Sequence, residues 1–350
     1  MLLQRLSDAF GVSGCEEEVR SILAEAVRPH VDELRTDSMG NLIAIKRARA
    51  GISRPLRVML AAHMDEVGLM ITHIEKDGLL RFQPVGGIDP RLLPAKQVRI
   101  GRERVPGIIG VKPIHLLKPE ERERVVPVEQ LYIDIGAVSK EAAEKRVKVG
   151  DYAVFATRFG HHGLEGESRL VRGKAFDDRA GCAVLAAVLE GEPYPVEVAG
   201  VFTVQEEVGL RGARVAAYAL EPDVAIALEG TICDDLPKEK DQSPVTRVGK
   251  GPAITIADRS VVADRRLVQL LVDTAEKQGL PYQFKEPALG GTDAGAIHLT
   301  RAGVPSAALA VPSRYIHGPA SVLSLDDLEH TVALVRAVLP RLQDWPDLNL

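Results

Sequence analysis

The segment Arg57-Val-Met-Leu-Ala-Ala-His-Met-Asp65 combines an apolar run with a polar end, and it decides the fold class. Residues 57–62 are compact and apolar, which is typical of a strand buried on both faces of a parallel sheet. His63 and Asp65 follow at once. In open α/β sheets, ligands bind beyond the carboxyl ends of the strands. This segment therefore predicts both a central strand and the place of a site.

Apolar runs and helical spacing alternate on both sides of this segment. Residues 2–34 have helical spacing that is broken by a glycine-containing turn at 11–14, and a strand is expected at 42–45. Beyond residue 175 the sequence predicts helix 178–189, strands 198–204 and 223–228, helix 263–278, strands 282–285 and 305–311, and helix 325–338. Such alternation predicts an α/β three-layer sandwich with a mostly parallel central sheet.

The region between these two parts has a different sequence pattern. From about 71 to 165, short β-like pieces alternate with Gly and Pro turns, and helical periodicity is nearly absent. The chain has 350 residues, enough for about two domains. We therefore expect a discontinuous α/β domain formed by 1–70 and 166–350, with a small β-rich domain, 71–165, inserted into it.

Composition limits the classes of function. The 44 basic and 49 acidic residues give a net charge of −5, which disfavours a nucleic-acid partner. Aromatic residues make up only 4%, too few to favour stacking of sugars or bases. No apolar run approaches the ~18 residues of a membrane span, and Arg5 and Asp8 interrupt any signal-peptide pattern. Three dispersed cysteines suggest a reducing compartment, so we expect a cytoplasmic protein without a membrane partner.

Acidic and imidazole side chains follow several predicted strands, and an acidic pair opens a helix. They are Glu206 and Glu207 after strand 198–204, Glu229 after 223–228, His317 six residues after 305–311, and Asp177-Asp178 before helix 178–189. Each has an ordinary interpretation by itself, as a helix cap or as solvated loop acids. Together they fall on one rim of the sheet, where crowded carboxylates would repel one another unless a dication neutralised them.

The residue types of this cluster favour particular metals. Histidine and carboxylate without cysteine suit Zn²⁺, Co²⁺ or Mn²⁺ better than Cu(I) or an iron–sulfur cluster. The i, i+2 spacing of His63 and Asp65 puts both side chains on one side of the strand end, so Asp65 can accept from the second ring nitrogen of His63. Glu206 and Glu207 are adjacent and should point to different places. One can bind metal while the other carries a proton.

Seven segments together carry a resemblance to a known family. They are Gly11-Val-Ser-Gly14 with 16–20, Ala61-Ala-His-Met-Asp-Glu-Val-Gly68, Gly173-Lys-Ala-Phe-Asp-Asp-Arg-Ala-Gly181, Thr203-Val-Gln-Glu-Glu-Val-Gly-Leu-Arg-Gly-Ala213, Ala227-Leu-Glu-Gly-Thr231, Gly290-Gly-Thr-Asp-Ala294 and Arg314-Tyr-Ile-His317. In this order they resemble the dinuclear-metal aminopeptidases that include glutamyl aminopeptidase and the tetrahedral (TET-type) aminopeptidases. Some members of that family carry an endoglucanase label.

The resemblance implies a zinc-peptidase-like sandwich and two divalent metal ions per subunit, zinc or cobalt, with manganese as an alternative. It implies that Asp177 bridges the two ions. His63 and Glu229 then complete the coordination of one ion, and Glu207 and His317 complete that of the other. Glu206 is then the base that activates a water bridging the metals, Asp65 orients His63, and Gly291, Thr292 and Asp293 line the substrate pocket. The sequence departs from the family in two places. Glu229 stands where relatives often have Asp, and Gly-Pro-Ala-Ser follows His317 where a Glu is usual.

The implied function is a metal-dependent aminopeptidase acting on peptides with a free N-terminus. The family also implies a homo-oligomer, a dodecamer assembled through the 71–165 domain. Two alternatives stay open: another dinuclear hydrolase on the same scaffold, such as a deacylase or carboxypeptidase, and a scaffold without activity. A glycosidase is disfavoured because most use two carboxylates and no metal.

Overall fold

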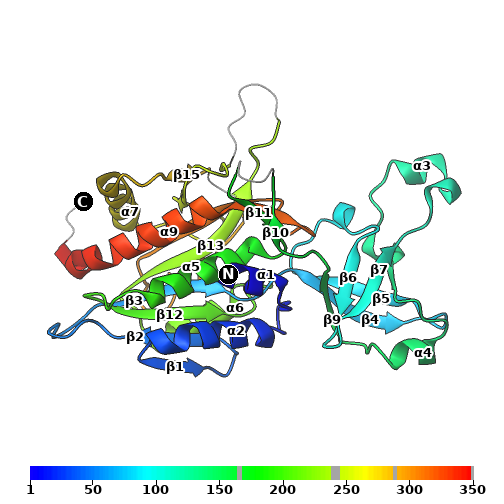
Figure 1. Cartoon of the computed structure of the whole chain (residues 1–350), viewed down its shortest axis with the longest axis horizontal. Coiled ribbons are helices and arrows are strands. Elements are labelled where there is room, and N and C mark those ends of the chain that lie inside the picture. The colour runs from blue at the N-terminus through cyan, green and yellow to red at the C-terminus, as the bar shows by residue number, and fades with distance from the viewer. Residues whose placement is uncertain (164–167, 238–244, 287–289, 348–350) are drawn as a thin grey trace.

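The computed structural model describes residues 1–163, 168–237, 245–286 and 290–347. Figure 1 shows an α/β body with a smaller β-barrel attached at one side. Both parts of the predicted fold class, the sandwich and the barrel-like insertion, are confirmed. None of the described helices is long and apolar enough to cross a membrane.

The body is built on one mixed sheet, whose strands run in the order β1–β2–β12–β3–β13–β16–β17–β11–β10; in addition, β14 pairs with β16, and β15 pairs with β14. Their bounds are β1 (Glu33–Thr36), β2 (Leu42–Lys46), β3 (Arg57–His63), β10 (Gly160–His161), β11 (Leu170–Gly173), β12 (Glu197–Thr203), β13 (Val224–Cys233), β14 (Ala253–Thr255), β15 (Gln283–Lys285), β16 (Ser306–Arg314) and β17 (Ser321–Ser324). The four central strands, β12, β3, β13 and β16, are parallel. Their carboxyl ends therefore meet at one edge of the sheet.

Helices cover both faces of this sheet. One face carries α1 (Leu2–Asp8), α2 (Glu17–Val27), α5 (Phe176–Glu190), α7 (Arg265–Gln278) and α9 (Leu325–Val338), and the other carries α6 (Arg211–Leu220) and α8 (Ala294–Ile297). Single 3₁₀ turns occur at Arg28–His30, Pro90–Leu92, Ile114–Leu116 and Val128–Gln130, and a longer 3₁₀ segment follows α9 at Leu339–Asp347. Alternate residues of β3 pack against the helices on opposite faces of the sheet. Leu60 packs in the cluster of α5, and Met59 and Ala61 pack in that of α6.

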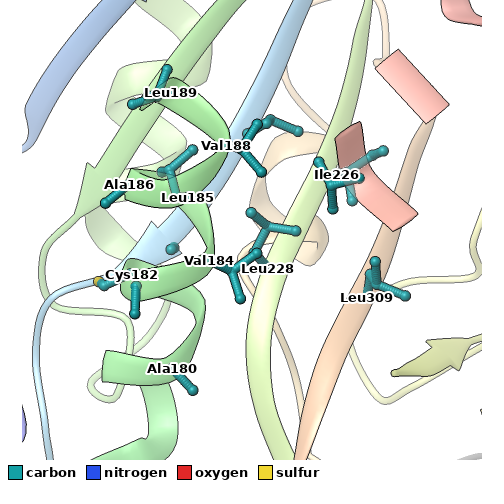
Figure 2. Packing of buried hydrophobic residues seen from close by; sticks show 14 of the residues in the cluster. Ala180, Cys182, Val184, Leu185, Ala186, Val188, Leu189, Ile226, Leu228 and Leu309 are labelled. Atoms are coloured by element: carbon teal, nitrogen blue, oxygen red, sulfur yellow. The ribbon is translucent and has the colours of Figure 1, made fainter. Parts of the chain in front are cut away.

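Close packing of α5 against β13 brings the start of that helix to the carboxyl edge of the sheet. Val184 and Val188 of α5 pack in one core with Leu228 of β13 (Figure 2). Gly181 allows this approach, because a Cβ on it would lie only 2.3 Å from the backbone oxygen of Leu228. Each fully buried side chain of this size contributes roughly 1.5–3 kcal/mol. The acidic pair at the start of α5 is therefore held firmly beside β13.

The smaller part is a closed antiparallel barrel, with the strand order β4–β5–β8–β7–β6–β9. Its strands are β4 (Gly68–Ile74), β5 (Leu80–Val85), β6 (Gln97–Ile100), β7 (Val105–Gly110), β8 (Tyr132–Asp134) and β9 (Tyr152–Phe155), and it also carries α3 (Pro119–Arg122) and α4 (Lys140–Glu144). Ile71, Phe82 and Ile133 belong to a hydrophobic core that is separate from that of the body. The expected boundary between residues 70 and 71 falls inside β4.

Two predictions about individual elements are wrong. The region 31–34, expected to have helical spacing, contains the start of β1, an exposed edge strand that is held by pairing with β2 rather than by its own pattern. The strand expected to end at 228 continues to Cys233, because β13 keeps pairing with β16 up to Arg314. Glu229 therefore lies within a strand instead of after one.

A buried ion cluster joins the N-terminal segment to the site region. The Lys174 ammonium donates to both carboxylate oxygens of Glu66, at 2.7 and 2.8 Å, and to the backbone oxygen of Ala9. The Arg179 guanidinium donates to the same carboxylate and to the backbone oxygen of Gly11. Because buried charges are tolerated only when paired, this cluster fixes the segments after β3 and at the start of α5 relative to each other.

Candidate metal centre

A cavity of about 940 Å³ opens at the carboxyl edge of the central strands. Its lining includes all five residues for which the resemblance implies metal binding, and the implied base: His63, Asp177, Glu206, Glu207, Glu229 and His317. They come from β3, the start of α5, the loop after β12, β13 and the loop after β16. Residues that are up to 254 positions apart in the chain thus face one space, as expected for this edge of an α/β sheet.

Asp177 lies between the two histidines. Its Oδ1 atom is 3.2 Å from Nε2 of His63, and its Oδ2 atom is 3.3 Å from Nε2 of His317. The peptide bond that follows, to Asp178, is cis. A carboxylate with one oxygen toward each imidazole has the arrangement required of a ligand shared by two ions.

Two groups of three side chains have ligand atoms close enough to share an ion. In each group, these atoms lie within 4.8 Å of one another: His63, Asp178 and Glu229 form the first, and Asp177, Glu207 and His317 form the second. Asp178 is already engaged, because its carboxylate accepts from the backbone N–H of His63 at 3.0 Å and from that of Gly181 at 2.8 Å. Asp177 is the acid whose oxygens face both histidines.

The outward nitrogens of the two histidines have carbonyl partners. Nδ1 of His63 is 3.1 Å from the backbone oxygen of Asp65 and 3.5 Å from its Oδ1. Nδ1 of His317 is 2.9 Å from the backbone oxygen of Gly87, in the segment after barrel strand β5. A carbonyl oxygen only accepts, so each Nδ1 carries a proton, and each Nε2, which faces Asp177, is the ring nitrogen that a metal ion could take in place of a proton.

The loop after β12 is fixed by side chains that accept from its backbone. Four consecutive N–H groups donate in this way: Val204 to Asn41 at 3.0 Å, Gln205 to Glu16 at 3.3 Å, and Glu206 and Glu207 to the two oxygens of Asp65 at 3.0 and 3.1 Å. Ser13 donates to Asp65 as well, at 2.6 Å. With the backbone fixed, the two adjacent glutamates present their side chains in different directions.

The site concentrates negative charge in a buried place. Burial raises the pKa of Glu206 and Glu229 well above the ordinary value, and although His63 lowers both, neighbouring carboxylates raise them further. Burial raises the pKa of Glu207 to about 8, against the opposing effect of His317. Burial lowers the pKa of His317, but Asp177 and Glu207 more than offset it, to about 9. These pKa shifts show that the positive charge near the buried carboxylates is too small to balance their negative charge.

Oε1 of Glu207 is among the buried atoms of the site that lack a hydrogen bond with a described residue, although Nε2 of His317 lies 3.3 Å away. An orphaned buried carboxylate oxygen is costly unless something else satisfies it. The donor set, the two Nε2 atoms that face Asp177 and this oxygen all fit a pair of divalent cations.

The three residues expected at the substrate pocket lie in two different environments. Gly291 and Thr292 line the cavity. Asp293 is completely buried, and it accepts from the Thr203 hydroxyl while its backbone N–H donates to Oε1 of Glu229 at 3.1 Å. It lies behind Glu229 and positions that carboxylate.

The sequence did not single out three supporting residues. Glu16 lies in a segment that matched the family, which was the available signal for it. Asn41 follows a turn and has no pattern that links it to residue 204. Gly87 contributes its backbone oxygen, which a sequence cannot distinguish from that of any other residue.

Glu16→Ala is expected to lower kcat about 10- to 100-fold with little change in KM, because the backbone of Gln205 loses its acceptor and the adjacent Glu206 is then poorly placed. Gln at this position keeps the accepting oxygen, so Glu16→Gln should retain most of the activity. Steady-state kinetics of both variants test this. Equal losses in the two variants would contradict a role based on hydrogen bonding.

Comparison with known proteins agrees with this geometry. The chain is 40% identical to the TET aminopeptidase from the marine sediment archaeon Thaumarchaeota archaeon SCGC AB-539-E09, whose crystal structure superposes with a TM-score of 0.91 over 97% of this chain and 96% of that one. It is 36% identical to the TET1 peptidase of Pyrococcus horikoshii, which assembles into a tetrahedron or a large octahedral shell, with a TM-score of 0.84 over 97% and 98% of the two chains.

A relative with a named preference is also similar over nearly its whole length. The lysyl aminopeptidase of Pyrococcus furiosus is 33% identical over 353 residues, which cover 98% of this chain and 97% of the relative. The family described as M42 glutamyl aminopeptidase matches residues 40–334. That match spans most of the chain and includes every residue placed around Asp177. The chain belongs to the M42 glutamyl aminopeptidase family.

Proposed function

We propose that this member of the family is a dinuclear-metal aminopeptidase that removes the N-terminal residue from peptides. The observation that supports it most is the position of Asp177, with one carboxylate oxygen toward each of two imidazole nitrogens. His63 and Glu229 would hold one cation, and Glu207 and His317 would hold the other. Asp177 would bind both cations. Zinc or cobalt, with manganese as an alternative, suits these ligands.

Two bound cations supply positive charge that lowers the pKa of a water molecule and polarises the scissile carbonyl. The chain's own part is to place a proton carrier beside that charge. Glu206 lines the cavity, and its Oε2 lies 3.9 Å from Nε2 of His63. Its pKa is above that of an ordinary glutamate, which suits a group that takes a proton from water and returns it to the leaving amine.

Free N-terminal aminoacyl anilides are expected to be hydrolysed, and a chelator should abolish this activity. N-Acetylation of the same substrates should reduce kcat/KM strongly, because the free α-amino group is the feature that restricts cleavage to the first residue. The measurement is the release of nitroaniline from paired free and acetylated substrates. Equal or faster turnover of the acetylated substrate would favour the alternative of a deacylase, and a preference for the last residue would favour a carboxypeptidase.

We also propose a homo-oligomer, a dodecamer by analogy with the family. The barrel exposes apolar side chains that contact with another subunit would cover, among them Ile114, Leu116 and Val138. The three cysteines are free thiols, which supports a reducing, cytoplasmic location. Peptides remain the proposed substrates, with no part assigned to nucleic acid or membrane.

A further inference from the structure

A second cavity, of about 660 Å³, lies where the barrel meets the body, and we call it the junction cavity. Its walls come from α1 and α2 of the body, from β6 and β9 of the barrel, and from the segment just before α5. Figure 1 shows α1 on the body side of this junction and β9 on the barrel side. The proposed metal ligands, all of them described residues, do not line this cavity.

Positive charge exceeds negative charge in the walls of the junction cavity. Among the described residues that line it, five are cationic and two are acidic: Arg5, Arg99, Arg104, Arg158 and Lys174, against Asp8 and Glu18. The excess is local, because the whole chain carries a net charge of −5. Cations that share a small space repel one another unless anions lie among them.

Two of the five cations have a carboxylate partner at short range. The Arg5 guanidinium pairs with Glu25 at 2.5 Å. The Arg104 guanidinium donates to Glu18 and also lies over the ring of Phe10, 4.6 Å from its centroid. Because these two charges are already balanced, neither requires a further ligand.

Arg158 has only a weak partner. Its guanidinium lies 3.9 Å from Asp8, and its side chain is 74% exposed. The Asp8 carboxylate also accepts from the backbone N–H of Phe159 at 2.9 Å. Ion pairs this long and this exposed contribute little to stability, so Arg158 is available to a ligand.

Arg99 is half-buried and has no ion pair or hydrogen bond with a described residue. It lies between Val98 and Ile100, which are buried in the barrel core, so its side chain projects from the opposite face of β6. Arg99 is directly opposite Val154 of β9, and Val154 packs with Phe10 of the body. Opposed residues share a face, so Arg99 lies on the barrel face that is turned toward the body.

The buried ion cluster beside the junction cavity has an excess of positive charge. The side chains of Lys174 and Arg179 are 3% and 0% exposed, and they share one carboxylate, that of Glu66. Nε of Arg179 has no hydrogen-bond partner among the described residues. Burial lowers the pKa of Lys174 to about 8, an effect that Glu66 opposes and Arg179 increases. Lys174 lines the junction cavity, so an anion there would balance this charge.

We propose that the junction cavity binds a phosphate group, free or carried by a small molecule, through Arg99, Arg158 and Lys174. A phosphate group carries about two negative charges and has three acceptor oxygens. Guanidinium groups match its oxygens with paired hydrogen bonds, and the cavity volume is that of a small-molecule site. The ligand would join the barrel to the body. Such binding does not depend on the proposed aminopeptidase function.

The test measures the binding of inorganic phosphate and of glycerol 3-phosphate to the full chain by calorimetry at constant ionic strength. We expect saturable binding with a Kd of about 1 mM or lower, which a few charge-assisted hydrogen bonds provide. Arg99→Met and Arg158→Met should each raise this Kd by about tenfold or more. Tighter binding of the ester would identify a phosphorylated small molecule as the ligand, and equal or tighter binding of inorganic phosphate would identify the free ion.

Arg5→Met is the matched control, because Arg5 lines the same cavity but is paired with Glu25. This substitution should change the Kd by less than about threefold. Absence of saturable binding of both compounds would overturn the proposal. So would an unchanged Kd in Arg99→Met, which would place the bound phosphate elsewhere, for example at the metal ions.

Thermal unfolding separates the loss of a ligand contact from a folding defect. Without phosphate, Arg99→Met should unfold at or above the temperature of the unaltered chain, because a repelling cation has been removed. Phosphate should raise the unfolding temperature of the unaltered chain more than that of Arg99→Met, since a ligand stabilises the state that binds it. A marked decrease for Arg99→Met without phosphate would show that Arg99 supports the fold, and would contradict the proposal.

Discussion

Glu206→Gln is expected to lower kcat by about 10³- to 10⁴-fold while both metal ions stay bound. The amide has the shape of the carboxylate but cannot take a proton from water. The backbone N–H of residue 206 still donates to Asp65, so the loop and the neighbouring Glu207 should keep their positions. The measurements are kcat on a free aminoacyl anilide and the metal content of the purified variant.

Glu207→Gln is the matched control for that experiment. Glu207 lies 3.3 Å from His317 and has a buried oxygen without a hydrogen bond, so its replacement should lose metal as well as activity. If Glu206→Gln loses metal and Glu207→Gln retains it, the two roles are exchanged. A decrease in kcat of less than tenfold in Glu206→Gln would contradict its role as the base.

Asp177→Asn should have the largest effect on metal binding. An amide presents one accepting oxygen, so one of the two imidazole nitrogens would face an NH₂ group instead of a carboxylate oxygen. We expect metal content to fall below one ion per chain and kcat/KM to fall by more than about 10⁴-fold, since the charge that stabilises the transition state is lost. Elemental analysis after dialysis, together with kinetics, measures both.

The neighbouring acid provides the comparison. Asp178 accepts from two backbone N–H groups, so Asp178→Asn should mainly lower the free energy of unfolding and retain metal. If Asp177→Asn retains two ions and Asp178→Asn loses them, the shared ligand is Asp178 and our assignment of Asp177 is wrong. Urea unfolding of both variants separates a folding defect from a defect in metal binding.

The sequence predicted the part of the site that depends on strand order. His63 ends a run of apolar residues, and parallel strands bring all their carboxyl ends to one edge, so a cluster there could be expected without coordinates. The roles of Asp177 and Glu206 came from the resemblance, because spacing alone does not tell one adjacent acid from the other. The contacts of Asp177 with both histidines now support that assignment.

The other features, the bounds of some strands and the burial of individual charged residues, depend on contacts that a pattern in the sequence does not encode. The extension of β13 past Leu228 is decided by pairing with β16, and the edge strand β1 is decided by pairing with β2. Lys285 is a charged residue in a short strand, and such residues are usually solvated. Its burial depends on how β14 and β15 are added to the sheet.

The most direct test is anomalous diffraction from crystals of the full chain grown with zinc, measured on both sides of the metal's absorption edge. We expect two anomalous peaks in each subunit: one beside His63 and Glu229, the other beside Glu207 and His317, with Asp177 between them. One peak or none at these side chains, in crystals whose dissolved protein hydrolyses aminoacyl anilides, would contradict a dinuclear centre.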